Sequence, residues 1–288
     1  MKIIVTGAAG MLGQDMLDEL PEDEVLPVDI QGDAIHLDIT DLEAVQSFMK
    51  KNKPDIVLHL AAYTNVDGCQ TDPDTAWKVN AGGTWNLASA CAEQGSGLLY
   101  ISSDFVFSGN GTHPYDEFDA VGPLSVYGKT KLAGERFTRS LVSRHYVVRT
   151  AWLYGARGKS FPGTMIRMAS EGKPLRVVGD QVGSPTYTRD LARYVSKIIR
   201  KPLYGVYHVT NSGQCSWYEF ARSAVAMYGM PEAQISRITS DEWPTPTKRP
   251  AYSVLAHQGL YLAGLEEPRH WQEALKEFIE EYKSLQTA

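Results

Sequence analysis

The chain has 288 residues, 43% of them hydrophobic and 22% charged, so it can bury a large core in one big domain or two unequal ones. Its net charge of −6, without a basic run, argues against nucleic acid or an anionic membrane as a partner, and no apolar run approaches the roughly 20 residues of a membrane span. The three scattered cysteines lack metal or redox spacing, so we expect no metal and a reducing, cytoplasmic setting.

The N-terminus predicts a strand, a glycine turn and a helix. Residues 2–6 form a short β-branched run typical of a buried strand, and Gly7, Gly10 and Gly13 follow before a helical pattern begins. A side chain at Gly7 or Gly10 would hold an anion away from the free N–H groups of that helix, so the spacing fits a dinucleotide phosphate. Asp29 ends the next strand, where an acidic group binds the adenosine ribose. A turn without a ligand and a capping Asp29 are the plainer alternatives.

Strand and helix patterns alternate through the first 150 residues. After the N-terminal unit, we predict strands over residues 34–38, 54–60, 97–101 and 146–150, and helices over 41–49, over 74–91 and after Pro123. This alternation predicts an α/β fold with a doubly wound parallel sheet of the Rossmann type. Ligands of such sheets bind at the carboxyl ends of the strands, so a crevice is expected beside residues that follow strand ends, namely Gly7, Asp29, Ala61, Ser102 and Trp152.

The pattern loosens after about residue 151, where glycine, proline and aromatic residues become frequent. A helix is predicted over residues 187–200, a strand returning to the main sheet over 205–210, and an amphipathic helix over 271–285. Ser216 fits the N-cap of a further helix, with Glu219 as its capping-box partner. We therefore predict a Rossmann domain over residues 1–150, with returning segments near 187–210, and a smaller interleaved C-terminal substrate domain over 151–186 and 211–288.

Tyr127 and Lys131 lie four residues apart in a predicted helix, so both side chains emerge on one face. An ammonium beside a phenol favours the phenolate, and we expect Lys131 to lower the Tyr127 pKa from about 10. Ser102 and Ser103 follow a predicted strand, where a hydroxyl can hold a carbonyl oxygen while Tyr127 gives it a proton. Taken alone, the Tyr-Lys spacing also fits an exposed helical pair, and the choice between the two serines stays open.

Longer motifs carry a resemblance to a known family. The glycine turn, the serines and the Tyr127–Lys131 motif resemble extended short-chain dehydrogenase/reductases, and finer motifs are similar to those of the dTDP-4-dehydrorhamnose reductases. The finer motifs occur in family order over nearly the whole chain, at residues 61–67, 102–109, 123–135, 149–155, 180–186 and 249–250. The resemblance implies that NADPH or NADH reduces the 4-keto group of a dTDP-sugar, dTDP-4-dehydrorhamnose, in the last step of dTDP-L-rhamnose synthesis.

The resemblance also implies roles for individual residues. Ser103, Tyr127 and Lys131 would form the catalytic triad. The implied cofactor contacts are Gly7, Gly10, Met11, Leu12, Asp29, Asp38, Ile39, Ala61, Ala62, Tyr63, Asn80, Ser102, Tyr127 and Lys131. The implied substrate contacts are Ser103, Asp104, Tyr127, Trp152, Ser184 and Thr186. Ser103 stands where the family usually has Thr, and Met11 where it often has Gln; either hydroxyl can donate, so we expect activity to be kept.

Other functions stay open at this point. Some proteins with this fold are regulatory subunits without catalysis, although intact Gly10, Tyr127 and Lys131 argue against that role. A different 4-keto nucleotide sugar is a third reading, because sugar epimers differ in the face presented to the hydride. Asp29 would accept the ribose 2′-hydroxyl of NADH and repel a 2′-phosphate, which favours NADH slightly and leaves NADPH open. The sequence does not fix the oligomeric state, and a homodimer is compatible with it.

Overall fold

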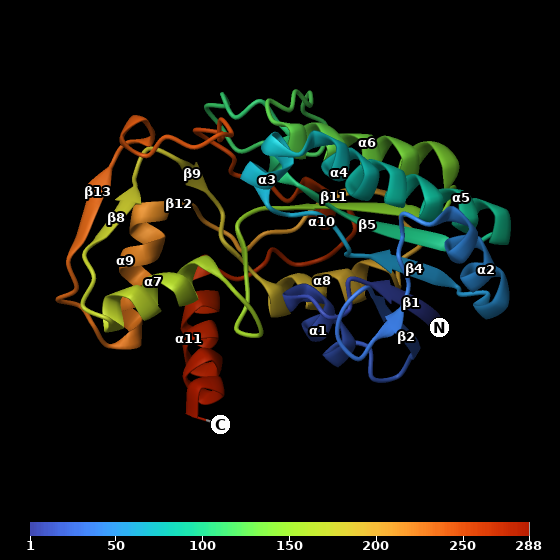
Figure 1. Ribbon diagram of the computed structural model, residues 1–288, viewed down its shortest axis with the longest axis horizontal. Coiled ribbons are helices and arrows are strands. Elements are labelled where there is room, and N and C mark those ends of the chain that lie inside the picture. Colours follow the sequence, from blue (N-terminus) through green and yellow to red (C-terminus); the bar gives the residue numbers. More distant parts are fainter. Residues whose placement is uncertain (288) are drawn as a thin grey trace.

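A seven-stranded parallel sheet forms the centre of the larger lobe in the computed structural model, which describes residues 1–287 (Figure 1). Its strand order is β11-β6-β5-β4-β1-β2-β3, and every neighbouring pair is parallel. The strands are β1 (Lys2–Thr6), β2 (Glu24–Asp29), β3 (Ile35–His36), β4 (Ile56–His59), β5 (Gly97–Ser103), β6 (His145–Thr150) and β11 (Gly205–His208). The chain order reverses between β1 and β4, which is where doubly wound sheets bind ligands. The predicted fold class is confirmed.

Helices cover both faces of this sheet because residues along each strand alternate between two apolar cores. Ile3 and Val5 of β1 point into a core shared with α1 (Met11–Asp18), α8 (Thr188–Ile198) and α10 (Gln258–Leu262). Ile4 points into the opposite core, with α2 (Leu42–Asn52) and α5 (Thr84–Gln94). The helix predicted after Pro123 is α6 (Val126–Leu141), which packs against β5 and α5.

The predicted long helix over residues 74–91 contains a π-helical turn. Short α3 (Val66–Thr71) precedes it, then α4 (Pro73–Ala76), the π segment η1 (Trp77–Gly83) and α5 follow without a break. A π turn makes room for an extra residue within a helix, and such turns occur frequently at functional sites. The sequence pattern gave the extent of this helix and missed the π turn, because apolar spacing does not report local unwinding.

A smaller lobe lies beside the carboxyl edge of the sheet, at the left of Figure 1. It contains α7 (Phe161–Ser170), α9 (Trp217–Tyr228) and α11 (Trp271–Thr287) around an aromatic core that includes Phe220 and Phe278. Its strand pairs are β7 (Leu153–Tyr154) with β10 (Thr186–Tyr187), β8 (Leu175–Val178) with β13 (Ile235–Ile238), and β9 (Val182–Gly183) with β12 (Cys215–Ser216). The short 3₁₀ turns are η2 (Asp104–Val106) and η3 (Ser240–Glu242).

The smaller lobe has a core of its own, but some residues pack across the proposed division of the chain. Tyr187, within the segments near 187–210 assigned to the Rossmann domain, packs in the aromatic core of the smaller lobe. Leu260 and Ala263, in and beside α10, pack into the sheet core although they fall within the 211–288 segment assigned to the substrate domain. The predicted capping box at the start of α9 is present, with Ser216 accepting from the Glu219 N–H. No helix among residues 1–287 is long and apolar enough to cross a membrane.

Candidate active site

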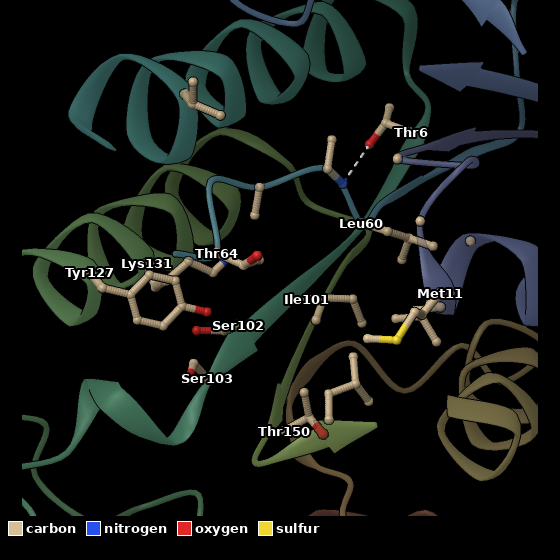
Figure 2. A pocket seen from close by; sticks show the side chains of 18 of the residues that line it. Thr6, Met11, Leu60, Thr64, Ile101, Ser102, Ser103, Tyr127, Lys131 and Thr150 are labelled. Atoms are coloured by element: carbon tan, nitrogen blue, oxygen red, sulfur yellow. Dashed lines mark hydrogen bonds between the residues drawn. The ribbon is translucent and has the colours of Figure 1, made fainter. Parts of the chain in front are cut away.

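A cleft of about 710 Å³ opens at the carboxyl edge of the sheet, between the two lobes (Figure 2). Its walls come from the glycine turn, the ends of β2, β4, β5 and β6, helix α6, and segments of the smaller lobe. Most of the predicted site residues line it: Gly7, Gly10, Met11, Leu12, Asp29, Asp38, Ile39, Ala61, Ala62, Ser102, Ser103, Asp104, Tyr127, Lys131 and Trp152. Tyr63, Asn80, Ser184 and Thr186 are not among the described residues that line the cleft.

The glycine turn has the backbone and donor groups that a dinucleotide phosphate needs. Gly7 has φ +72°, and a Cβ there would come within 2.7 Å of the Ala61 nitrogen, so a larger residue would push the turn off β4. Helix α1 starts at Met11 with Gly10 as its N-cap, and no side chain of the described residues caps it. The free N–H groups of its first turn therefore face a cleft lined by Met11 and Leu12, which suits an anion.

Asp29 organises the turn from the end of β2. Its Oδ2 accepts from the Ala9 N–H at 3.0 Å, and its Oδ1 accepts from the N–H groups of Ile30 at 2.7 Å and Gln31 at 3.2 Å. The capping role is thus present, and the carboxylate also lines the cleft where the ribose contact is predicted. Asp38 and Ile39 follow β3 on the same side of the cleft.

The two neighbouring serines have different partners. The Ser102 hydroxyl donates to Glu135 Oε1 at 2.6 Å, and Glu135 forms a buried ion pair with Arg149 at 2.8 Å. The Ser103 hydroxyl donates to Asp104 Oδ1 at 2.8 Å and interacts with the phenol of Tyr127. Figure 2 shows both serines at the end of β5, with Tyr127 and Lys131 entering from α6. These contacts favour Ser103 as the hydroxyl that acts with Tyr127.

Tyr127 and Lys131 both lie on α6, in the first two turns after the N-cap Ser125. Burial of the phenol raises the pKa of Tyr127 above its ordinary value, the Asp104 carboxylate raises it further, and the hydrogen bond with Ser103 lowers it. Burial lowers the pKa of Lys131 to about 7, against the attraction of Glu135. The net shift is therefore upward, opposite to the predicted lowering of the Tyr127 pKa by Lys131, because loss of solvent is its largest cause.

Asp104 is the most perturbed carboxyl of the cleft. It is 2% exposed, and burial raises its pKa to about 6 although hydrogen bonds from Ser253 and Ser103 lower it. Its Oδ2 is buried and has no hydrogen-bond partner among the described residues. A buried acceptor with a pKa near neutral, beside a tyrosine and a serine, is typical of a site that handles protons or sugar hydroxyls.

Trp152 forms an aromatic wall with a residue that the sequence did not single out. Trp152 has φ +48°, rare for a non-glycine residue, and its indole stacks on Trp217 with ring centres 3.6 Å apart and planes 9° apart. Both rings line the cleft, together with Arg249. The helix start after Ser216 was predicted, but nothing in its spacing indicates that Trp217 turns toward the cleft.

Of the four predicted site residues outside the cleft, three hold its walls through their side chains, and the backbone of Tyr63 is held by one of them. Asn80, in η1, accepts from the Tyr63 N–H at 2.8 Å and donates to the Tyr63 carbonyl at 3.1 Å, which fixes the loop after β4. Ser184 donates to the Gly213 carbonyl at 2.9 Å, and Thr186 donates to the Ala151 carbonyl at 2.6 Å, next to Trp152. Each of these side chains positions backbone that borders the site.

The glycine turn suits a nucleotide phosphate, and Ser103, Tyr127 and Lys131 lie in the same cleft. Together these features define a nicotinamide-dependent reductase of the short-chain dehydrogenase/reductase class. The model of the RmlD substrate binding domain family matches residues 1–284. The chain belongs to this family, that of the dTDP-4-dehydrorhamnose reductases.

Three relatives illustrate the similarity. The chain is 41% identical to the spore coat polysaccharide biosynthesis protein SpsK of Bacillus subtilis, over 98% of each chain. It is also 41% identical to a dTDP-4-dehydrorhamnose reductase of Streptomyces griseus, over 95% of this chain and 91% of the relative. The structure of a Bacillus anthracis dTDP-4-dehydrorhamnose reductase in complex with NADP is 40% identical, with a TM-score of 0.93 over 97% of this chain and 99% of that one.

Proposed function

We propose that the protein uses NADPH or NADH to reduce the 4-keto group of dTDP-4-dehydrorhamnose, giving dTDP-L-rhamnose in the last step of its synthesis. The carrying observation is that Ser103, Tyr127 and Lys131 meet in one cleft with the glycine turn, while Asp104 and Trp152 border the same space. Family membership and the NADP complex of a 40% identical relative support the substrate class and the cofactor.

The bound cofactor supplies the hydride, and the residues of this chain supply the proton and the charge stabilisation. The raised pKa of Tyr127 keeps its phenol protonated at neutral pH, which is the form needed by a proton donor in the reducing direction. With substrate bound, the Ser103 hydroxyl exchanges its bond to Asp104 for one to the oxygen that receives the proton, and removal of such a donor typically costs about 10²–10³ in rate. Lys131, when protonated, stabilises the negative charge left on the Tyr127 oxygen.

The cofactor contacts that we propose are the free N–H groups of α1 for the phosphates and Asp29 for the adenosine ribose. Because Asp29 already accepts from three backbone N–H groups, its charge is partly offset, and we propose that NADPH and NADH both serve. Asp104 and Trp152 are the proposed hexose contacts, and Ser184 and Thr186 act on the sugar through the backbone that they hold.

A cytoplasmic location and a homodimer complete the proposal. All three cysteines are free and buried, which suits a reducing compartment. Trp77 and Trp85, on η1 and α5, are 45% and 41% exposed and offer apolar surface to a second copy. Light scattering of the purified protein tests the dimer, and a monomer at all concentrations would contradict it.

The deciding assay follows NADPH or NADH oxidation with dTDP-4-dehydrorhamnose generated in situ, and identifies the product sugar by NMR. We expect turnover that depends on the dTDP-sugar and yields dTDP-L-rhamnose. Folded protein without turnover on either cofactor would point to a regulatory subunit. Faster turnover of another 4-keto nucleotide sugar, or a different epimer as product, would reassign the substrate.

A further inference from the structure

The cleft has few cationic side chains for a substrate that carries a diphosphate. Among its lining residues, all in the described part of the chain, Lys131 and Arg249 are the only Lys or Arg side chains. Three carboxylates also line it, those of Asp29, Asp38 and Asp104, in a chain of net charge −6. A dinucleotide and a dTDP-sugar each bring a diphosphate to this space, so the two need separate positive groups.

The other positive groups already have assigned roles. The free N–H groups of α1 serve the cofactor phosphates in the proposed function. Lys131 is 3% exposed, lies four residues after Tyr127 on α6 and takes part in the proposed proton chemistry. Arg249 is therefore the cation left for the second diphosphate, and its guanidinium is the side chain best suited to grip one in a bidentate manner.

Arg249 forms an ion pair with Asp67 that a ligand anion could replace. Its Nη2 lies 2.9 Å from Asp67 Oδ2 in α3, and the two side chains are 31% and 33% exposed. An ion pair whose two side chains are each about a third exposed adds little to stability, so a ligand anion can compete with the carboxylate for the guanidinium. The second oxygen of Asp67, Oδ1, is buried without a hydrogen-bond partner among the described residues.

Contacts with other segments hold the backbone on both sides of Arg249, so the point from which its side chain extends is fixed. Thr247 donates from its hydroxyl to the Val66 carbonyl at 3.1 Å. Pro250 packs against Gly109, which has φ +74° and has no room for a Cβ, and the Tyr252 N–H donates to the Gly109 carbonyl at 3.1 Å. Gln70 of α3 in turn accepts from the Val126 N–H at 3.3 Å, one residue before Tyr127.

We propose that Arg249 binds the diphosphate of the nucleotide sugar by exchanging the Asp67 carboxylate for phosphate oxygens. The inference rests on the proposed function and adds a diphosphate subsite to it. Asp67 orients the guanidinium before the substrate arrives and competes with the substrate for it. Because α3 also contacts the start of α6, the exchange takes place beside the helix that presents Tyr127.

The test compares dTDP with thymidine as competitive inhibitors, since only dTDP carries the diphosphate. Arg249→Gln is expected to weaken dTDP inhibition by about 10–100-fold, as for loss of a hydrogen-bonded charge, and to leave thymidine within about 2-fold. Its KM rises while kcat falls far less. Arg249→Lys keeps the charge without the fork and is expected to recover most of the dTDP affinity. Asp67→Asn removes the competitor and is expected to tighten dTDP by about 2–5-fold.

Two results would overturn the inference while leaving the function intact: equal weakening of dTDP and thymidine in Arg249→Gln, or weaker dTDP binding in Asp67→Asn. Either result would show that the Asp67–Arg249 ion pair has only a structural role. Thr247→Val is the matched control, because it loosens the same segment without changing charge and should affect both inhibitors alike. Wild-type protein that binds neither inhibitor and turns over no dTDP-sugar would instead reject the proposed function. Thermal melting verifies that each variant is folded.

Discussion

Two polar clusters meet at the end of β5, and they differ in how completely their groups are paired. Ser102, Glu135, Arg149 and His208 form a closed cluster, in which Glu135 receives bonds from Ser102 at 2.6 Å and from Arg149 at 2.8 and 2.9 Å. Ser103, Asp104, Tyr127 and Lys131 form an open cluster, in which one buried oxygen of Asp104 has no hydrogen-bond partner in the described part of the chain.

The difference distinguishes polar side chains that stabilise the core from adjacent polar side chains that can act on a ligand. A buried network whose members are all bonded stabilises one arrangement of the core. A buried network with an acceptor left free keeps capacity for a ligand. Ser102 and Ser103 are adjacent and have the same side chain, yet the partner of Ser102 places it in the closed cluster and the partner of Ser103 places it in the open one.

The largest expected effect lies in the open cluster. Tyr127→Phe should lower kcat by about 10²–10⁴-fold, because the proton donor is lost while the ring is kept. The fold and NADPH affinity should stay near wild type, as measured by circular dichroism and cofactor fluorescence. Turnover near the wild-type rate would remove the proton-donor role from Tyr127.

Disrupting the closed cluster should cost stability. Glu135→Gln leaves Arg149 buried without its counter-charge, since the Arg149 side chain is 3% exposed, and should destabilise the fold by about 3–5 kcal/mol. Urea unfolding measures this loss. A change below about 1 kcal/mol, the size of a surface ion pair, would show that the closed cluster does not hold the core.

The serines provide the most direct comparison between the clusters. Ser103→Ala should lower kcat by about 10²–10³-fold, as for loss of a donor to the reacting oxygen. Ser102→Ala, the matched control, should instead lower stability by about 1–3 kcal/mol, because it removes one bond from buried Glu135. Steady-state kinetics and urea unfolding of both variants separate the roles, and a larger rate loss in Ser102→Ala would exchange them.

The smallest expected effect is a pH dependence of stability. The pKa of Asp104 is about 6 in the folded protein against about 3.9 when unfolded, so the folded state binds more protons between those values. Stability from this group is therefore lost as pH rises from 4 to 6, with a slope of at most about 1.4 kcal/mol per pH unit. Asp104→Asn cannot ionise, so the variant should lack this slope, and the slope should appear as a pH dependence of the difference in unfolding free energy between wild type and variant. Parallel curves across this window would place Asp104 in a more solvated setting.

Much of this molecule could be predicted from local sequence. The β-branched run at residues 2–6, the glycine turn and the Ser216 N-cap each depend on contacts within a few residues, and all three are present. The i,i+4 spacing placed Tyr127 and Lys131 on one helix, and both line the cleft.

Other properties depend on what folds around a residue. The direction of the Tyr127 pKa is set by burial, and the choice of Ser103 is set by Glu135 and Arg149, which lie more than 30 residues further along the chain. Trp217 and Arg249 reach the cleft from segments far along the chain from the glycine turn and α6, and no short pattern reports that packing. Sequence spacing shows which side chains lie close together on one helix or strand, while the burial of a side chain and its hydrogen-bond partners depend on the whole fold.

The π turn in η1 also sets the rotational phase of one long helix. A regular α-helix turns each residue by about 100°, so the directions of its two halves are tied to one another. The extra residue in η1 lets Asn80 face Tyr63 while Leu87 and Cys91 of α5 still face the sheet. Deleting one residue within Trp77–Gly83 would restore the regular turn and force one half to rotate away from its partners. The π turn thus lets one half of the helix pack in the core and the other half support the cleft wall, without a fixed angle between the two packing faces.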